Sequence, residues 1–286
     1  MVAGRHEFFS SYTRKFIISH ILERAIMAER KKLIIVGGVA GGASAAARAR
    51  RLSEDAEIIM FERGDYVSFA NCGLPYHIGG VIPDRERLIV QTPDSLRKRF
   101  LIDVRTGMEV IRIDRMEEKV IVRDLKTGAQ SVERYDCLLL SPGAEPVRPN
   151  IPGAGSSRVF TLRSLGDMDV IKEFVDTAKP ARAVVIGAGY IGLEMTEALA
   201  ERGIKVILVE LMNQVMGPLD PEMAALLNQQ IAMHGVEMRL GISVTELREE
   251  KGGITAILNT GETVAADFVM MNVGVKPETR LAREAG

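Results

Sequence analysis

One cysteine lies in a segment whose residue types suit thiol chemistry. Cys72 follows Asn71, is followed by Gly73, and stands just before the helix-like run 74–78. A helix N-terminus favours the thiolate, which is the nucleophile in disulfide exchange. No second cysteine lies three to five residues away, so Cys72 would have to pair with an external sulfur. The alternative is an inert thiol, which its polar and glycine-rich neighbours disfavour.

A glycine-rich turn precedes this segment. The apolar run 32–36 breaks into the turn Gly37–Gly42 and then into the alanine-rich stretch 43–49, a pattern that predicts strand, tight turn and helix. Such a turn lets backbone amides approach a pyrophosphate at the helix N-terminus. Glu62 ends the next apolar run, 20 residues beyond Gly42, where a dinucleotide fold places a carboxylate against the ribose. Val39 occupies the middle glycine position. Taken alone, this turn is therefore also consistent with glycines that only allow the helix to pack closely against the strand.

A second copy of the pattern follows about 150 residues later. Gly187, Gly189 and Gly192 match G-x-G-x-x-G after the strand-like run 183–186, and the next apolar run ends at Glu210, 18 residues beyond Gly192. Two fingerprints imply two dinucleotides. The fold class predicted is therefore α/β, with two Rossmann-like dinucleotide-binding domains and a small antiparallel β element.

Composition narrows the function classes. The chain has 286 residues and a formal net charge of −1, which gives no basic face for nucleic acid, and no apolar run approaches the length of a membrane span. The two cysteines, 65 residues apart, argue against a disulfide framework and predict a cytoplasmic protein. Cys137 lies in the apolar run 135–140 and is predicted to be a buried core residue. No metal site is predicted.

The domain organisation follows from Pro/Gly-rich boundaries. Residues 1–30 are predicted to be a poorly ordered extension, with Met27 as a plausible true start. Dinucleotide-binding domains are expected at 31–150 and 151–273, with 274–286 returning to the first domain. Helices are predicted from 93 and over 167–178 and 220–234, and hairpin strands over 109–113, 119–123 and 131–140.

At the segment 68–76, Ser-Phe-Ala-Asn-Cys-Gly-Leu-Pro-Tyr, together with 141–144 and 272–274, the chain resembles the FAD-dependent pyridine nucleotide–disulfide oxidoreductases. The resemblance covers residues 31–286 and is to the single-cysteine branch of CoA-disulfide reductases, persulfide reductases and NADH oxidases and peroxidases. It implies a redox-active Cys72 with Asn71 and Ser68 beside it. It implies FAD contacts from Gly37, Gly38, Val39, Ala40, Gly41, Gly42, Glu62, Arg63, Val110, Ser141, Gly143 and Ala144. It implies nicotinamide nucleotide contacts from Gly187, Gly189, Tyr190, Ile191, Gly192, Glu194, Glu210 and Gly274.

The resemblance also bears on substrate. Ser44, Arg48 and Arg51 would face the thiol substrate, and their i, i+4, i+7 spacing places them on one helix face. A cationic stripe there could hold the phosphates of CoA, although solvated surface arginines are the alternative. Ala40 stands where the oxidases and peroxidases carry a histidine, which disfavours peroxidase. Phe100 replaces a substrate-contacting lysine of the family.

The implied reaction passes electrons from NADH through FAD to Cys72, which reduces a small-molecule disulfide or persulfide such as CoA disulfide. Glu210 favours NADH, with NADPH possible, because a carboxylate would repel a 2′-phosphate. Full-length relatives continue into a dimerisation domain, so the sequence is interpreted as truncated at the C-terminus, and a homodimer is expected of the full-length relatives. An NADH oxidase or peroxidase, or an inactive truncated remnant, stays open.

Overall fold

The computed structural model describes residues 31–286, and the predicted extension over residues 1–30 lies outside this range. The described chain forms two compact units. The first holds residues 31–64, 93–141 and 284–286, and the second holds 65–92 and 142–283. Each unit contains a parallel sheet, which confirms the predicted α/β class.

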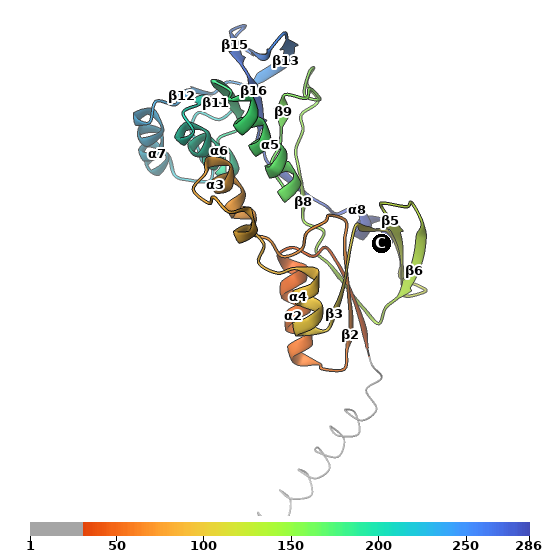
Figure 1. Ribbon diagram of the computed structural model, residues 1–286. Coiled ribbons are helices and arrows are strands. Elements are labelled where there is room, and N and C mark those ends of the chain that lie inside the picture. The colour runs from red at the N-terminus through yellow and green to blue at the C-terminus, as the bar shows by residue number, and fades with distance from the viewer. Residues whose placement is uncertain (1–30) are drawn as a thin grey trace, which may run out of the picture. The chain divides into compact units, whose positions relative to one another are not determined.

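The first unit is built on a four-stranded sheet in the order β3-β2-β1-β7, with every neighbouring pair parallel. Helices α2 and α4 lie on one face of it (Figure 1). Buried Ile34, Ile35 and Phe61 fill its core. The elements are β1 (Lys32–Val36), α2 (Gly41–Leu52), β2 (Glu57–Glu62), α4 (Pro93–Phe100), β3 (Ile102–Thr106) and β7 (Cys137–Leu140).

The predicted antiparallel element is present in the same unit. Strands β4 (Met108–Asp114), β5 (Lys119–Asp124) and β6 (Gln130–Arg134) pair in sequence order. The predicted strand 131–140 is therefore two strands, β6 and β7. Glu133 on β6 receives hydrogen bonds of 2.6 Å from both Lys32 and Arg105. Burial opposes ionisation of Glu133, but these bonds outweigh it and hold the carboxyl pKa below its ordinary value.

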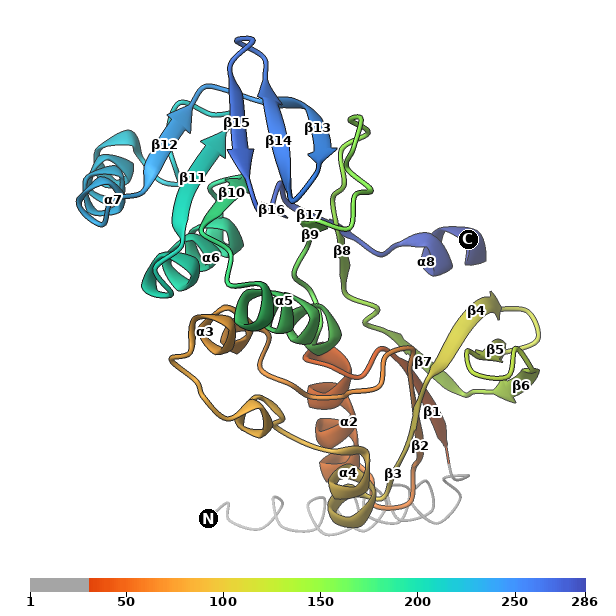
Figure 2. The same ribbon diagram turned by 45° about the horizontal axis from the view of Figure 1, so that its top comes forward.

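The second unit has a five-stranded parallel sheet in the order β12-β11-β10-β16-β9 and an antiparallel sheet of β13, β14 and β15 (Figure 2). Ser164 caps α5 by accepting a hydrogen bond from the Asp167 amide. The elements are α3 (Leu74–Gly79), β8 (Ala144–Pro146), β9 (Val159–Phe160), α5 (Leu165–Ala178), β10 (Arg182–Ile186), α6 (Tyr190–Glu201), β11 (Lys205–Glu210), α7 (Pro221–Met233), β12 (Glu237–Leu240), β13 (Val244–Glu250), β14 (Gly253–Leu258), β15 (Thr263–Ala266), β16 (Phe268–Met271) and β17 (Val275–Pro277). A short helix, α8 (Arg280–Ala285), ends the chain.

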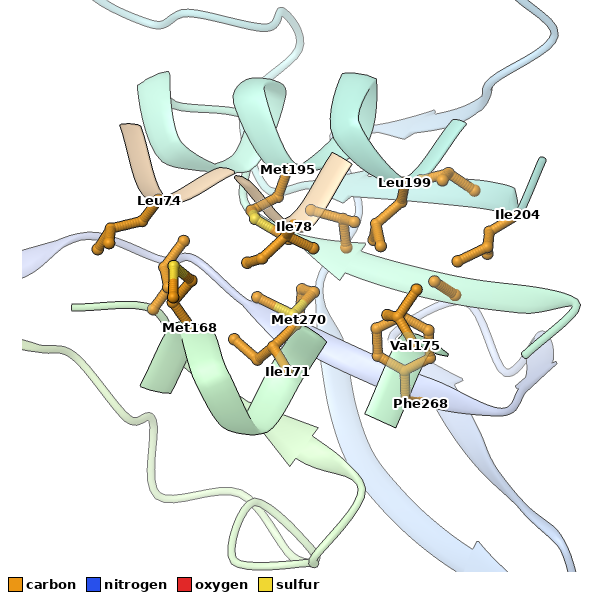
Figure 3. Packing of buried hydrophobic residues seen from close by; sticks show 14 of the residues in the cluster. Leu74, Ile78, Met168, Ile171, Val175, Met195, Leu199, Ile204, Phe268 and Met270 are labelled. Atoms are coloured by element: carbon orange, nitrogen blue, oxygen red, sulfur yellow. The ribbon is translucent and has the colours of Figure 1, made fainter. Parts of the chain in front are cut away.

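The short helix α3 packs into the core of this second unit. Leu74 and Ile78 lie in one buried cluster with Met168 of α5 and Met195 of α6 (Figure 3). Residues 65–92, which the sequence places in the first domain, thus lie in the second compact unit. The assignment of each domain to one dinucleotide stays a prediction.

The prediction that Cys137 is a buried core residue is wrong. Cys137 is exposed in the described chain. Its strand, β7, is the edge of the four-stranded sheet, and Leu138 and Leu139 are only partly buried. An apolar run predicts a strand but does not show whether neighbours cover it on both sides.

Candidate functional site

The first glycine turn has a backbone that only glycine accommodates at two points. Gly37 has φ 93°, in the region that favours glycine. A Cβ added at Gly42 would lie 1.8 Å from the Gly37 carbonyl oxygen. The Glu62 carboxylate accepts from the Gly38 amide at 2.7 Å and from the Gly64 amide at 2.8 Å. The strand end, the turn and the start of α2 are therefore held as one piece.

The second glycine turn is built in the same way. Gly187 has φ 96°, and a Cβ added at Gly192 would lie 1.9 Å from the Gly187 carbonyl oxygen. Glu210 accepts from the Ala188 amide at 2.6 Å and from the Met212 amide at 2.7 Å. In both units the helix after the turn starts beside the ends of parallel strands, where the N-terminal amides suit a pyrophosphate.

The thiol segment presents Cys72 and Asn71 at the surface of the second unit, in a 3₁₀ turn over Asn71–Gly73. Ser68 adopts φ 47°, and its carbonyl accepts from the amides of Val90 and Gln91. A non-glycine residue in this conformation is uncommon and stores strain. The hydrogen bonds from Val90 and Gln91 thus hold the backbone of this segment in an unfavourable conformation.

A buried contact and a partly exposed ion pair hold this segment in place. Gly73 packs so closely that an added Cβ would lie 2.5 Å from Leu88, and Leu88 is 1% exposed. Arg85 donates two hydrogen bonds of 2.7 Å to the Asp169 carboxylate on α5. A bidentate guanidinium–carboxylate pair is among the more specific polar contacts in proteins. An exposed thiol therefore stands on a fixed base.

The chain matches the model of a known protein family. A family model described as pyridine nucleotide-disulphide oxidoreductase matches residues 31–286. The chain belongs to that family. Coenzyme A disulfide reductase of Staphylococcus haemolyticus is 35% identical over 250 residues, which cover 87% of this chain and 55% of that protein.

Two solved structures are similar to this chain. The reduced CoADR-RHD of Bacillus anthracis has a TM-score of 0.88 and 49% identity, covering 90% of this chain and 46% of the other. A NAD-dependent persulfide reductase from A. fulgidus has a TM-score of 0.85 and 34% identity, covering 89% and 48%. The chain thus spans about half the length of these similar proteins.

The other residues predicted for the nicotinamide nucleotide lie around the second turn. Tyr190 starts α6 and is 65% exposed, and Gly274 has φ 109°. Ile191 and Glu194 are partly buried on α6. Burial, with a smaller effect from Glu197, raises the pKa of the Glu194 carboxyl above its ordinary value. Their roles as ligands stay predictions.

The residues predicted for FAD divide between the two units. Gly37–Gly42, Glu62, Arg63, Val110 and Ser141 belong to the first unit, and Gly143 and Ala144 belong to the second. The Ser141 hydroxyl donates to the Gly37 carbonyl at 3.2 Å, so it closes the first turn. Arg63 is exposed, whereas Val110 is buried on β4. Among the residues predicted for FAD, Ser141 and Glu62 thus make hydrogen bonds to the first glycine turn.

The predicted substrate-facing stripe lies on α2. Ser44, Arg48 and Arg51 are all exposed, in agreement with their shared helix face. Arg50, on a different face, donates to the backbone carbonyls of Glu54 and Phe100 and has a structural role instead.

Within residues 31–286, no cluster of three or more histidine, cysteine or acidic side chains could hold a metal ion. None of the described helices is long and apolar enough to span a membrane. One residue against the second turn, Asn272, was not among the predicted site residues. Its signal was positional, because it directly follows β16 as Ser141 directly follows β7.

Proposed function

We propose that this chain is the nucleotide-binding part of a flavin-dependent oxidoreductase that uses NADH to reduce a CoA disulfide or persulfide through Cys72. The observation that carries the proposal is the exposed Cys72, held on a fixed base in a unit that also contains a complete dinucleotide turn. The proteins similar to this chain include coenzyme A disulfide reductases and a persulfide reductase, which supports the same reaction class.

The geometry of the first turn suits an adenine dinucleotide, and we assign FAD to it. The glycine positions leave the backbone bare where a Cβ would clash, and Glu62 stands at the ribose position of such folds. Gly37–Gly42, Glu62 and Ser141 would hold the adenosine diphosphate portion. When bound, the flavin supplies two-electron transfer between nicotinamide and sulfur.

Cys72 would carry the sulfur chemistry. Its thiolate attacks one sulfur of the substrate disulfide, forming a mixed disulfide with Cys72 while the other sulfur leaves as a thiolate and takes a proton. Two electrons from NADH then cleave the mixed disulfide and release the second thiol. The balance is one NADH, one proton and one disulfide consumed for one NAD⁺ and two thiols.

Substrate and nucleotide preferences follow from charge. Exposed Arg48 and Arg51 would attract the phosphates of a CoA disulfide. Glu210 would repel the 2′-phosphate of NADPH, and the next residue, Leu211, is 70% exposed and offers no positive charge. We therefore infer NADH as the preferred reductant.

Two broader properties belong to the same proposal. This chain spans about half the length of its relatives. We infer that the whole protein acts as a homodimer, as expected of the full-length relatives. A cytoplasmic location is inferred from the two cysteines, which are both free in the described chain.

The test uses the 286-residue chain supplied with FAD under anaerobic conditions. The flavin absorption should bleach with NADH and respond less to NADPH, and CoA disulfide should be reduced. Cys72→Ser should lower the rate of CoA disulfide reduction by at least about 100-fold, because the nucleophile is gone. Cys137→Ser is the matched control, since it removes the other exposed thiol, and should keep the rate.

Three other outcomes would contradict the proposal. If both cysteine variants reduce the disulfide equally, Cys72 is not the redox centre. In a separate aerobic assay, NADH-dependent oxygen consumption that persists in Cys72→Ser without any disulfide reduction would favour an NADH oxidase. A chain that takes up no FAD and does not oxidise NADH would favour an inactive remnant.

A further inference from the structure

The sheet of the second unit has a point where its strand order reverses. From β10 the chain runs through α6 to β11 and β12 on one side, whereas β16 pairs with β10 on the other side. In open parallel sheets, ligands bind at the carboxyl ends of the strands that flank such a point. Asn272 directly follows β16 and therefore occupies this position.

Asn272 is fixed against the second glycine turn. Its amide donates to the Ile186 carbonyl at 2.8 Å. A Cβ added at Gly187 would lie 2.4 Å from the Asn272 carbonyl oxygen, and one added at Gly192 would lie 3.6 Å from the Asn272 Cβ. The residue thus touches both glycines that frame the predicted pyrophosphate position.

The side-chain amide of Asn272 has unmet hydrogen-bonding capacity. Its Nδ2 is buried and has no hydrogen-bond partner among the described residues. Most buried polar atoms are paired, so an unpaired one needs an explanation. The residue as a whole is partly exposed, so rotation about the side-chain bonds can turn the amide toward a ligand.

The first unit provides an internal comparison. Ser141 occupies the equivalent place, directly after β7 and beside β1, and its amide donates to the Val36 carbonyl. The Ser141 hydroxyl is satisfied within the turn by the Gly37 carbonyl. The two turns therefore share a backbone design but differ at this side chain, and only Asn272 keeps a free donor.

We propose that the Asn272 amide donates a hydrogen bond to a pyrophosphate oxygen of the bound nicotinamide nucleotide. This assignment rests on the proposed function, because it names a further binding residue of the same site. An amide donor suits a pyrophosphate, which offers only acceptors. A carboxylate at this position would meet the same oxygens with like charge.

Calorimetric titration of the full chain with NAD⁺ and with ADP-ribose tests the assignment. Asn272→Ala should raise the Kd for both ligands by about 10-fold or more, as expected for a hydrogen bond to a charged group. Asn272→Asp should weaken binding further. Asn228→Ala is the control, because Asn228 on α7 also has a buried atom without a partner but lies outside the predicted site, and it should leave both Kd values unchanged.

A second readout separates binding from folding. Without ligand, Asn272→Ala should melt within about 2 °C of the unmodified chain, since the buried donor has no partner to lose. A melting temperature lowered by more than this, or a loss of affinity confined to NAD⁺, would overturn the assignment. So would unchanged affinities in Asn272→Ala when the unmodified chain binds both ligands. If the unmodified chain binds neither ligand, the proposed function itself fails.

Discussion

The two carboxylates at the ends of β2 and β11 have a double role. Glu62 and Glu210 each accept two backbone hydrogen bonds, one from the glycine turn and one from two residues ahead. Charge-assisted bonds of this kind hold a turn firmly. The same carboxylates face the position where a ribose diol is expected. Substitution of either residue would therefore disturb the turn as well as the nucleotide contact.

Glu194 gives a pH prediction at this scale. Burial and Glu197 raise the pKa of Glu194 in the folded chain. Ionisation of Glu194 therefore destabilises the folded state above this raised pKa. It has no such effect below the pKa that Glu194 has in the unfolded chain. Glu194→Gln should therefore stabilise the chain at neutral pH, by less than about 1 kcal/mol because solvent screens a partly exposed group.

Thermal melts of the unmodified chain and of Glu194→Gln from neutral to acidic pH would check this. The difference in melting temperature should shrink as the pH falls through the raised pKa. Glu197→Gln, on the exposed face of α6, should show a smaller effect. A difference that grows at acidic pH would contradict the assigned direction.

Some of these residues could be predicted from sequence and others could not. Gly42 and Gly192 were predictable, because an added Cβ would collide with the backbone and the strand–turn–helix pattern marks the place. Cys137 was mispredicted, since its exposure depends on which strand flanks β7. Asn272 is informative only once the sheet topology shows that it lies at the point where the strand order reverses.

At the scale of elements, α3 is the part that sequence reasoning placed least well. A short helix after Cys72 was expected, but its partners are more than 80 residues away in the chain, on α5 and α6. Local patterns carry no information on such contacts. The helix also ends against α6, where Arg202 donates to the Ile78 carbonyl at 3.1 Å. The packing of α3 therefore depends on residues of both α5 and α6.

Gly79 makes this packing testable. An added Cβ would lie 3.1 Å from both the Cα and the Cβ of Ala198, so Gly79→Val should overpack the contact and lower the free energy of unfolding by about 1–3 kcal/mol. As α3 loosens, Cys72 should react faster with an aromatic disulfide reagent. Gly166→Ala on α5 is the control, because an added Cβ there meets only one atom, at 3.7 Å.

Urea unfolding and the rate of thiol labelling would measure both effects. Gly166→Ala should be neutral or stabilising by up to about 1 kcal/mol, since alanine favours helix over glycine. Equal stabilities for Gly79→Val and the unmodified chain would show that the α3–α6 contact yields without cost. An unchanged labelling rate in a destabilised Gly79→Val would show that α3 does not hold the thiol in place.

At the scale of the whole chain, the thiol segment and the second glycine turn belong to one compact unit, whereas the first turn belongs to the other. A ligand that binds only the folded form of a unit stabilises it by about 2.7 kcal/mol at 100 times its Kd. NAD⁺ should therefore slow amide hydrogen exchange in α3 together with the β10–β11 region. Strands β4–β6 of the first unit are the internal control and should exchange at unchanged rates with NAD⁺.

FAD should give the complementary pattern, with slower exchange in β1, β2 and the start of α2. Leu74 and Ile78 of α3 are part of the buried core of the second unit. Local unfolding of α3 would therefore expose apolar surface of that core. Its protection should thus follow NAD⁺ and not its position in the sequence between β2 and α4. Exchange in α3 that ignores NAD⁺ while β10–β11 responds would show that the thiol segment opens independently of the nucleotide-binding core.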